Sequence, residues 1–229
     1  MIRAILFDLD GTLVDGERDS VTAMVQVVES AFSVTVGRAE RDFVIGRSWR
    51  AIHERLAAVH PEVTWSYEEL VERVVAERAR IIARDGAQLL PGARAAIDRF
   101  GHLSRALVTG SSRAEAEQML AALDRAAAFD VVLASEDVAR SKPAPDGYLD
   151  AARTLGVEPV ECAVIEDSEP GIASGLAAGV AAVVAVAAGN AHGHDQSRAD
   201  RIVSTLDELS DELLTEVARA SAVRRAGAD

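Results

Sequence analysis

Residues 8–12, Asp8-Leu9-Asp10-Gly11-Thr12, decide the fold, because they directly follow the apolar run of residues 4–7, Ala-Ile-Leu-Phe. Four consecutive apolar residues of this kind predict a buried β-strand. Ligands of open parallel α/β sheets bind beyond the carboxyl ends of the strands, which is where Asp8 and Asp10 would then lie. Asp and Gly are equally typical of an ordinary turn. The choice between a site and a turn therefore depends on the rest of the chain.

The composition is that of a globular protein with one large domain or two smaller ones, since 49% of the 229 residues are hydrophobic. The formal net charge of −13 argues against nucleic acid or an anionic membrane surface as a partner. The one cysteine, Cys162, cannot form an internal disulfide, and no apolar run is long enough to span a bilayer. We therefore expect a cytoplasmic enzyme or binding protein, and the choice between monomer and dimer stays open.

Helical periodicity dominates residues 15–88. It predicts one helix over residues 20–32, two shorter helices within residues 38–59 that are separated at Gly46, and a fourth over residues 66–84. Ser66 followed by Glu69 is a capping-box signature for the start of the fourth helix. This part of the chain has no convincing strand.

From residue 90 onward, predicted helices alternate with short apolar runs. Strands are expected at residues 106–109, 131–134, 162–165, 181–186 and 201–204, and helices at residues 91–100, 113–123, 145–155, 169–178 and 206–218, followed by a frayed tail. This alternation predicts an α/β fold with a parallel sheet and right-handed crossovers. The expected architecture is a Rossmann-like, three-layer core domain of residues 1–14 and 89–229. An inserted α-helical domain of residues 15–88 would open and close over its crevice.

Polar side chains follow four of the predicted strands. They are Asp8 and Asp10, then Thr109, Ser111 and Ser112, then Lys142, and finally Glu166 and Asp167. Carboxylates crowded at one sheet edge repel each other unless a hard cation such as Mg²⁺ lies among them. A hydroxyl and a lysine beside such a metal suit a phosphoryl group. The sequence therefore predicts phosphoryl transfer.

Lys142 is the one lysine among 24 basic residues. Its compact ammonium differs chemically from the planar guanidinium that the chain uses elsewhere, and the flanking prolines of residues 141–146 predict a stiff loop. Chance could also have placed the lysine here. Its position beyond a predicted strand favours a functional role.

Several polar residues have a structural interpretation beside the functional one. Thr109 is able both to bind an anion and to cap the helix that follows, whereas for Ser111 and Ser112 we expect capping. A further group of polar residues in a Gly/Ala-rich segment superficially resembles a metal cluster: Asn190, His192, His194 and Asp195. It lacks the ligand spacing of a zinc site, so we expect a solvated loop there.

Taken together, residues 8–12, Thr109, Lys142-Pro143 and residues 166–171 resemble the four motifs, in order, of the haloacid dehalogenase superfamily. The strings Lys-Pro-Ala-Pro-Asp and Glu-Asp-Ser-x-x-Gly-Ile resemble the branch that contains β-phosphoglucomutase and sugar-phosphate phosphatases. Residues 15–88 resemble the α-helical cap domain of that branch. The resemblance covers residues 1–14 and 90–205 of the core.

The resemblance implies that Asp8 is the nucleophile, which takes the phosphoryl group as an aspartyl phosphate. Asp10 would protonate the leaving alkoxide and then activate the attacking water. Thr109 and Lys142 would hold the phosphoryl oxygens. Backbone N–H groups at Leu9, Asp10 and Gly110 would complete the phosphate site.

The resemblance also implies a cofactor, Mg²⁺. Its ligands would be the Asp8 carboxylate, the backbone carbonyl of Asp10 and the Asp167 carboxylate, with Glu166 bound through water or orienting the others. The implied function is a Mg²⁺-dependent phosphatase of a small phosphorylated metabolite, with a sugar phosphate expected. Because the metal pair and the acid suit phosphate esters, dehalogenation is disfavoured.

The cap departs from the mutase pattern. Where β-phosphoglucomutase has a histidine after the first motif, this chain has Ser20, which favours a phosphatase over the alternative of a sugar-phosphate mutase. Residues 46–50 resemble the family's substrate-specificity loop. Arg47 or Arg50 in that loop would contact a second anionic group of the substrate, or would serve as plain surface residues. A catalytically silent binding protein is disfavoured, because no core group is missing.

Overall fold

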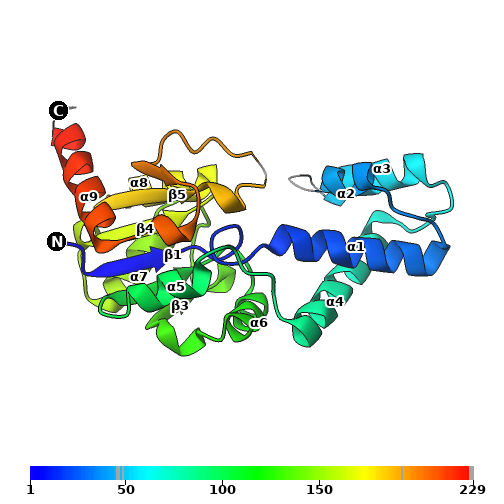
Figure 1. The fold of residues 1–229 in the computed structure, drawn as a ribbon, viewed down its shortest axis with the longest axis horizontal. Coiled ribbons are helices and arrows are strands. Elements are labelled where there is room, and N and C mark those ends of the chain that lie inside the picture. The colour runs from blue at the N-terminus through cyan, green and yellow to red at the C-terminus, as the bar shows by residue number, and fades with distance from the viewer. Residues whose placement is uncertain (45–46, 48, 192, 227–229) are drawn as a thin grey trace.

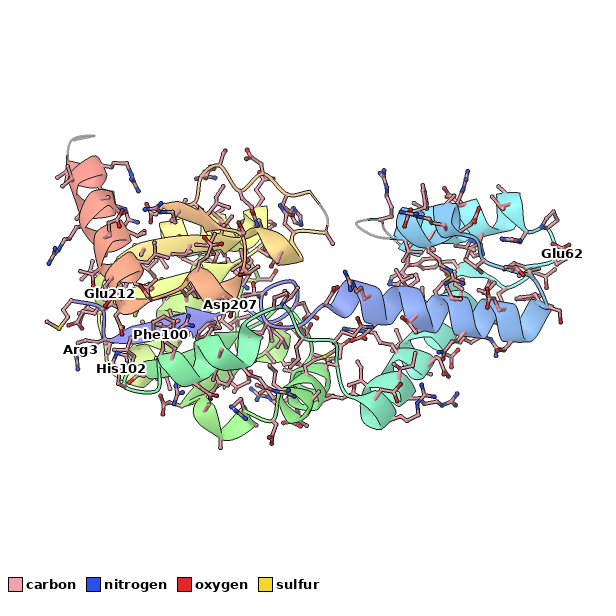
Figure 2. The ribbon with its side chains drawn as sticks, viewed as in Figure 1. Arg3, Glu62, Phe100, His102, Asp207 and Glu212 are labelled. Carbon is pink, nitrogen blue, oxygen red and sulfur yellow. The ribbon has the colours of Figure 1, made fainter. Side chains whose placement is uncertain are left out.

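The computed structural model describes residues 1–44, 47, 49–191 and 193–226. The molecule is elongated, with an α/β region at one end and a purely helical region at the other (Figure 1). Figure 2 shows Glu62 at the far tip of the helical region, whereas Arg3 and His102 lie at the opposite end of the molecule. Two antiparallel connectors join the regions, because Leu13 and Asp15 exchange backbone hydrogen bonds with residues 88–90.

Within the described residues, one sheet of six parallel strands forms the centre of the α/β region, in the order β3-β2-β1-β4-β5-β6. The strands are β1 Ala4–Phe7, β2 Ser104–Val108, β3 Val131–Leu133, β4 Cys162–Glu166, β5 Ala182–Val186 and β6 Arg201–Val203. The predicted α/β fold class is therefore confirmed. β1 pairs with both β2 and β4, which places the first motif at the middle of the sheet.

Helices cover both faces of this sheet (Figure 1). They are α5 Ala93–Arg99, α6 Arg113–Leu123, α7 Asp146–Leu155, α8 Glu169–Ala177 and α9 Asp211–Ala226. Alternate residues of β1 point to opposite faces: Ile5 and Phe7 belong to the apolar cluster under α5, α6 and α9, and Ala4 and Leu6 to the cluster under α7 and α8. The result is a three-layer core with two buried clusters.

The helical region consists of α1 Gly16–Phe32, α2 Arg38–Val44, α3 Trp49–Val59 and α4 Tyr67–Asp85. It has an apolar cluster of its own, in which Met24 and Val28 of α1 meet Leu70 and Val74 of α4. The predicted capping box is present, because the Ser66 hydroxyl accepts the Glu69 N–H and the Glu69 carboxylate accepts the Ser66 N–H. None of the helices in the described residues is both long and apolar enough to cross a membrane.

The predicted bounds of two helices were wrong. The first helix begins at Gly16 rather than residue 20, because the Asp15 carboxylate accepts the Arg18 N–H and caps it there. The last helix covers residues 211–226, not 206–218. The arginines of the expected frayed tail hold this helix in place. Arg224 pairs with Asp200 at 2.6 Å, and Arg225 donates to a backbone carbonyl. Residues 227–229 of that tail lie outside the described residues.

Candidate active site

Lys142 connects the ends of three neighbouring strands. Its ammonium lies 2.5 Å from Asp8 Oδ1 after β1, 3.0 Å from the Val108 carbonyl of β2 and 2.7 Å from Glu166 Oε1 of β4. An ammonium has three hydrogens to donate, so these contacts use all of them. Burial lowers the pKa of Lys142, but the charges of Asp8 and Glu166 outweigh it and hold the pKa well above its ordinary value. The lysine is therefore a fixed positive charge beside Asp8.

Glu166 is fully buried and holds the loop after β4 in place. Besides Lys142, its carboxylate accepts hydrogen bonds from the Tyr148 hydroxyl and from the Asp167 N–H, the Ser168 N–H and the Ser168 hydroxyl. Burial raises its pKa, but Lys142 and these hydrogen bonds outweigh burial, and the pKa is lowered. Because both oxygens already accept donors, Glu166 suits an orienting role more than direct metal ligation.

Asp8, Glu166 and Asp167 form a buried acidic cluster in which one oxygen from each lies within 4.8 Å of the others. Burial and repulsion by the other two carboxylates raise the pKa of Asp8 well above its ordinary value. Burial, followed by the charge of Glu166, raises the pKa of Asp167 to about 7. A cation among these oxygens offsets both the cost of burying the charged carboxylates and the repulsion between them.

This cluster fits Mg²⁺, which prefers carboxylate and carbonyl oxygens. The approach of Asp167 to the first motif depends on Gly11, where a Cβ atom would lie 2.3 Å from Asp167 Oδ2. Thr12 donates its hydroxyl to the other Asp167 oxygen at 3.2 Å. Asp8 and Asp167 are the residues of this cluster that would hold the ion, and ligation by the backbone carbonyl of Asp10 stays a prediction.

The carboxylate of Asp10 contacts two residues outside this cluster. Ser111 Oγ donates to Asp10 Oδ2 at 2.5 Å, so the expectation that Ser111 is a helix cap was wrong. Ser112 alone caps α6, since its hydroxyl accepts the Glu115 N–H. On the opposite side, Arg78 of α4 lies 3.5 Å from Asp10 Oδ1. Sequence reasoning missed Arg78, because nothing in the helical pattern shows which arginine faces the sheet.

The predicted phosphate-binding residues lie at the ends of β1 and β2. Thr109 is buried after β2, and its hydroxyl oxygen accepts the Ser111 N–H at 3.0 Å, which leaves the hydroxyl proton for an anion. A Cβ atom at Gly110 would meet nothing within 4 Å, so its backbone has open space beside it. Leu9 is buried, and its carbonyl accepts the Leu13 N–H at 2.8 Å in the turn after β1. Phosphate binding by these residues stays a prediction.

The two predicted cap arginines contact aromatic rings within the helical region. The Arg47 guanidinium lies 5.5 Å from the centre of the Phe43 ring, and that of Arg50 lies 4.5 Å from the centre of the Tyr67 ring. Both side chains are exposed. Gly46 and Ser48 of the predicted specificity loop lie outside the described residues. The structure therefore does not bring Arg47 and Arg50 into contact with the strand-end residues.

Hydrogen bonds between side chains and the backbone hold the polar segment after β5. Asn190 accepts the His194 N–H at 2.7 Å and donates to the His194 carbonyl at 2.8 Å. Asp195 accepts the Ser197 N–H. His192 lies outside the described residues. These contacts fit the expected loop.

Tyr148 is a second residue that sequence reasoning missed. It is buried on α7, donates to Glu166 Oε1 at 2.9 Å and places its ring 5.2 Å from the Lys142 ammonium. Its position six residues after Lys142, on the helix that the lysine loop leads into, was the available signal. Its hydroxyl orients the Glu166 carboxylate, which in turn positions the Lys142 ammonium.

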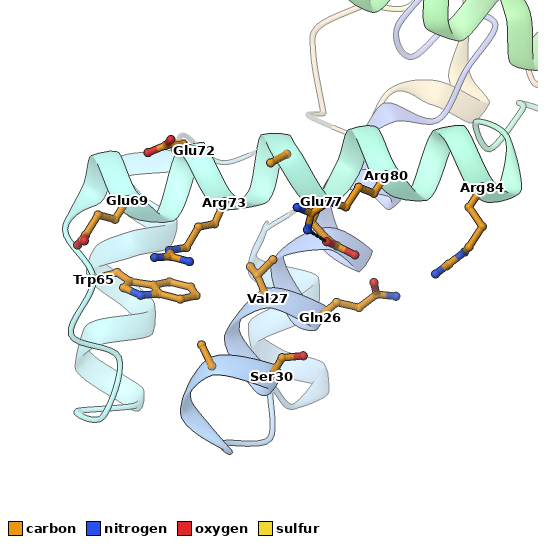
Figure 3. A pocket seen from close by; sticks show the side chains of 12 residues that line it. Gln26, Val27, Ser30, Trp65, Glu69, Glu72, Arg73, Glu77, Arg80 and Arg84 are labelled. Carbon is orange, nitrogen blue, oxygen red and sulfur yellow. Dashed lines mark hydrogen bonds and ion pairs between the residues drawn. The ribbon is translucent and has the colours of Figure 1, made fainter.

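Two hollows differ in their chemistry. The larger, about 860 Å³, lies between α1 and α4 on the helical region and is lined by Trp65, Arg73 and Arg80 among others (Figure 3). Arg73 stacks on Trp65 and Arg80 pairs with Glu77, so these charges are already engaged. The smaller, about 190 Å³, is lined by residues of both regions: Asp10, Gly11, Gly16, Ser20, Arg78, Asp167 and Gly189. We place the candidate active site at the smaller one, because Asp10 and Asp167 line it. Thr109 and Lys142 line a separate hollow of about 130 Å³.

A haloacid dehalogenase-like hydrolase family model matches residues 2–179. This chain belongs to the haloacid dehalogenase-like hydrolases. It is 34% identical over 173 residues to hexitol phosphatase B of Escherichia coli K12, which covers 75% of this chain and 78% of that protein. It is 30% identical over 181 residues to the fructose-1-phosphate phosphatase of the same organism, covering 73% of this chain and 88% of that one.

Solved structures have the same fold. The crystal structure of CbbY from Rhodobacter sphaeroides in complex with phosphate superposes with a TM-score of 0.64 at 25% sequence identity, and the match covers 92% of this chain and 97% of that one. The family resemblance drawn from the four motifs is thus confirmed. So is the prediction that the chain is an enzyme of this family, with phosphatases among its relatives.

Proposed function

We propose that the protein is a Mg²⁺-dependent phosphatase of small phosphorylated metabolites, sugar phosphates in particular, that works through an aspartyl phosphate on Asp8. The contact that carries the proposal is the one between Lys142 and Asp8 at 2.5 Å, beside the buried acidic cluster. Relatives at 30–34% identity are named as phosphatases of a hexitol and of fructose 1-phosphate, which supports the substrate class.

Asp8 would attack the phosphorus atom while the bond between phosphorus and the ester oxygen breaks. Asp10 would give its proton to the departing alkoxide. In the second step, Asp10 would take a proton from the water that attacks the phosphorus, which frees inorganic phosphate and restores Asp8. Thr109 would hold a phosphoryl oxygen, and the charge of Lys142 beside Asp8 would stabilise the phosphoryl group. Mg²⁺, when bound, would neutralise charge shared by the carboxylates and the phosphoryl group.

We propose further that residues 15–88 act as a cap domain on a core of residues 1–14 and 89–229. The connectors lie side by side, since the Asp15 N–H donates to the Gln88 carbonyl at 2.7 Å and the Leu90 N–H to the Leu13 carbonyl at 3.0 Å. A paired hinge of this kind lets the helical region move as one body over the strand ends. Closure would exclude water from the first step.

Ser20 favours a phosphatase over a mutase. It lies on α1 beside the smaller cavity, and its hydroxyl donates to the Gly16 carbonyl of its own helix at 2.9 Å. An imidazole at this position would add a titratable group that Ser20 does not supply. A coupled assay with β-glucose 1-phosphate and a bisphosphate activator separates the alternatives, because a mutase forms the 6-phosphate and a phosphatase releases inorganic phosphate.

Phosphate release from a panel of phosphorylated metabolites, with and without Mg²⁺, tests the proposed function. We expect turnover that needs Mg²⁺ and that Asp8→Asn abolishes. Asp150→Asn is a matched control, since Asp150 pairs with Arg153 on the outer side of α7. Turnover by Asp8→Asn at the wild-type rate, or full turnover in the presence of a chelator, would contradict the proposal.

A further inference from the structure

Arg78 brings a cation from the helical region to the strand ends. It lies in α4, lines the smaller cavity together with Asp10, and its side chain is 19% exposed. Its Nε atom is buried and has no hydrogen-bond partner among the described residues. The neighbouring turn of α4 is fixed against the core, because Gln118 of α6 donates to the Ala79 carbonyl at 2.8 Å.

The Asp10 carboxylate has a different partner on each oxygen. Ser111, from the core, donates to Oδ2 at 2.5 Å, whereas Arg78, from the helical region, lies 3.5 Å from Oδ1. A carboxylate with a hydrogen-bond donor on one oxygen and a cation beside the other has few orientations left. The Arg78 contact exists only while α4 lies against the core.

Gly16 leaves the space that this contact requires. A Cβ atom at Gly16 would lie 2.8 Å from Arg78 Nη2 and 2.9 Å from Asp10 Oδ1, between the two partners. The guanidinium faces two more carboxylates: Glu115, 3.8 Å from Nη1, and the buried Asp19 of α1. These hold Arg78 near the hinge without satisfying its Nε atom.

We propose that Arg78 is a positioning residue, which orients the Asp10 carboxyl toward the leaving oxygen when the helical region lies against the core. Proton transfer from Asp10 to the departing oxygen, as the bond between phosphorus and oxygen breaks, is then efficient only in the closed arrangement. Arg78 itself neither gains nor loses a proton. This inference rests on the proposed phosphatase function and assigns the coupling between cap closure and acid catalysis to one residue.

The test compares kcat/KM for phenyl phosphate and 4-nitrophenyl phosphate, which differ little in shape but strongly in how much the leaving oxygen needs a proton. We expect Arg78→Ala to lose about tenfold more kcat/KM on phenyl phosphate than on 4-nitrophenyl phosphate, since general acid catalysis matters most for the poorer leaving group. Arg78→Lys should recover part of the difference. Gly16→Ala, which keeps both charges but separates them, should show the same leaving-group dependence.

Two variants serve as matched controls. Arg80→Ala removes an arginine from the same helix whose side chain is 77% exposed and pairs with Glu77. Gly37→Ala adds a methyl group that meets the far end of the partly exposed Glu40 side chain. Both should leave the ratio of the two kcat/KM values unchanged, and melting temperatures of all variants show that they are folded.

Each outcome is decisive. Equal losses on both esters in Arg78→Ala would make Arg78 a binding or structural residue and overturn the inference, as would a Gly16→Ala variant with the wild-type ratio. A wild-type protein that releases phosphate from neither ester in Mg²⁺ would instead overturn the proposed function, and the inference with it.

Discussion

The strand ends of the core and the helical region hold their polar side chains in different ways. In the core, Lys142 contacts residues at the ends of three strands, and Glu166 accepts five donors from four residues. In the helical region, the exposed Arg47 and Arg50 lie over aromatic rings of their own region. The comparison teaches that the sheet edge fixes the residues of the proposed chemistry, whereas the exposed arginines of the helical region are fixed only by contacts within that region.

Of the substitutions in the two regions, replacement of Lys142 should cause the largest loss of activity. We expect Lys142→Met to lower kcat/KM by about 10³-fold or more, because it removes the charge beside Asp8 that would stabilise the phosphoryl group. It also leaves buried carboxylates without their partner, a change that costs on the order of 3–5 kcal/mol of stability. Lys142→Arg should rescue little, since a planar guanidinium cannot contact all three strand ends in the same space. Phosphate release and thermal unfolding of both variants measure this.

A smaller loss is expected at Gly171, which has no catalytic atom. A Cβ atom there would lie 1.6 Å from Glu166 Oε1, so Gly171→Ala must displace the carboxylate that holds Lys142. Forced displacement in a packed core costs about 1–3 kcal/mol, and we expect kcat to fall with little change in KM. Gly37→Ala is again the control. Wild-type kcat in Gly171→Ala would show that Glu166 does not position the lysine.

Removing the metal should make the melting temperature depend on the repulsion within the acidic cluster. The pKa of Asp167 rises from 3.8 to about 7 in the folded chain, through burial first and the charge of Glu166 second. A carboxyl whose folded pKa is raised stabilises the protein below its unfolded pKa, and this stability is lost as the pH rises through the folded pKa. Without metal, the melting temperature should therefore fall as the pH rises between those two values.

Mg²⁺ should then raise the melting temperature more at about pH 8 than at about pH 5, where protons take the place of the cation. Asp167→Asn removes one of the repelling charges, so it should flatten the pH dependence of the metal-free protein. Scanning calorimetry with EDTA or with Mg²⁺ measures both effects. A Mg²⁺ effect that is equal at the two pH values, or larger at the lower one, would contradict the account of the cluster.

The smallest effects are expected in the helical region. Arg47→Ala and Arg50→Ala should change kcat/KM for 4-nitrophenyl phosphate by less than about fivefold, because exposed arginines stacked on aromatic rings contribute on the order of 0.5–1 kcal/mol. A larger loss on a sugar phosphate than on the aryl ester would assign either arginine to substrate recognition. Large and equal losses on the sugar phosphate and the aryl ester would contradict the comparison, since residues of the helical region would then take part in the reaction itself.

Most of the core could be predicted from the sequence because its signals are local. An apolar run followed by Asp8 marks a strand end, and Gly156 after an amphipathic run marks a helix end, which the structure confirms with a left-handed cap at Gly156. Parallel strands end at the same sheet edge, so residues far apart in the chain could be placed together. This is why the grouping of Asp8, Lys142, Glu166 and Asp167 was correct.

The rest depended on packing that has no local signal. Ser111 and Ser112 are neighbours of the same type at a helix start, yet one bonds to Asp10 and the other caps α6. Arg78 and Arg80 lie two residues apart on α4, and the contacts between α4 and α6 decide which of them faces the strand ends. Arg224 was predicted to lie in a frayed tail. Helical periodicity relates residues that are close in sequence, so it could not predict the pairing of Arg224 with the distant Asp200.

Trapping the intermediate tests the central claim most directly. Wild-type protein mixed with 4-nitrophenyl phosphate and Mg²⁺, quenched within a turnover and reduced with borohydride, should convert the acyl phosphate at residue 8 to homoserine, which peptide mass spectrometry locates. Asp10→Asn should accumulate more of it, because hydrolysis of the intermediate would lack its base. Phosphate release in Mg²⁺ with no modification at Asp8 in either protein would contradict the account.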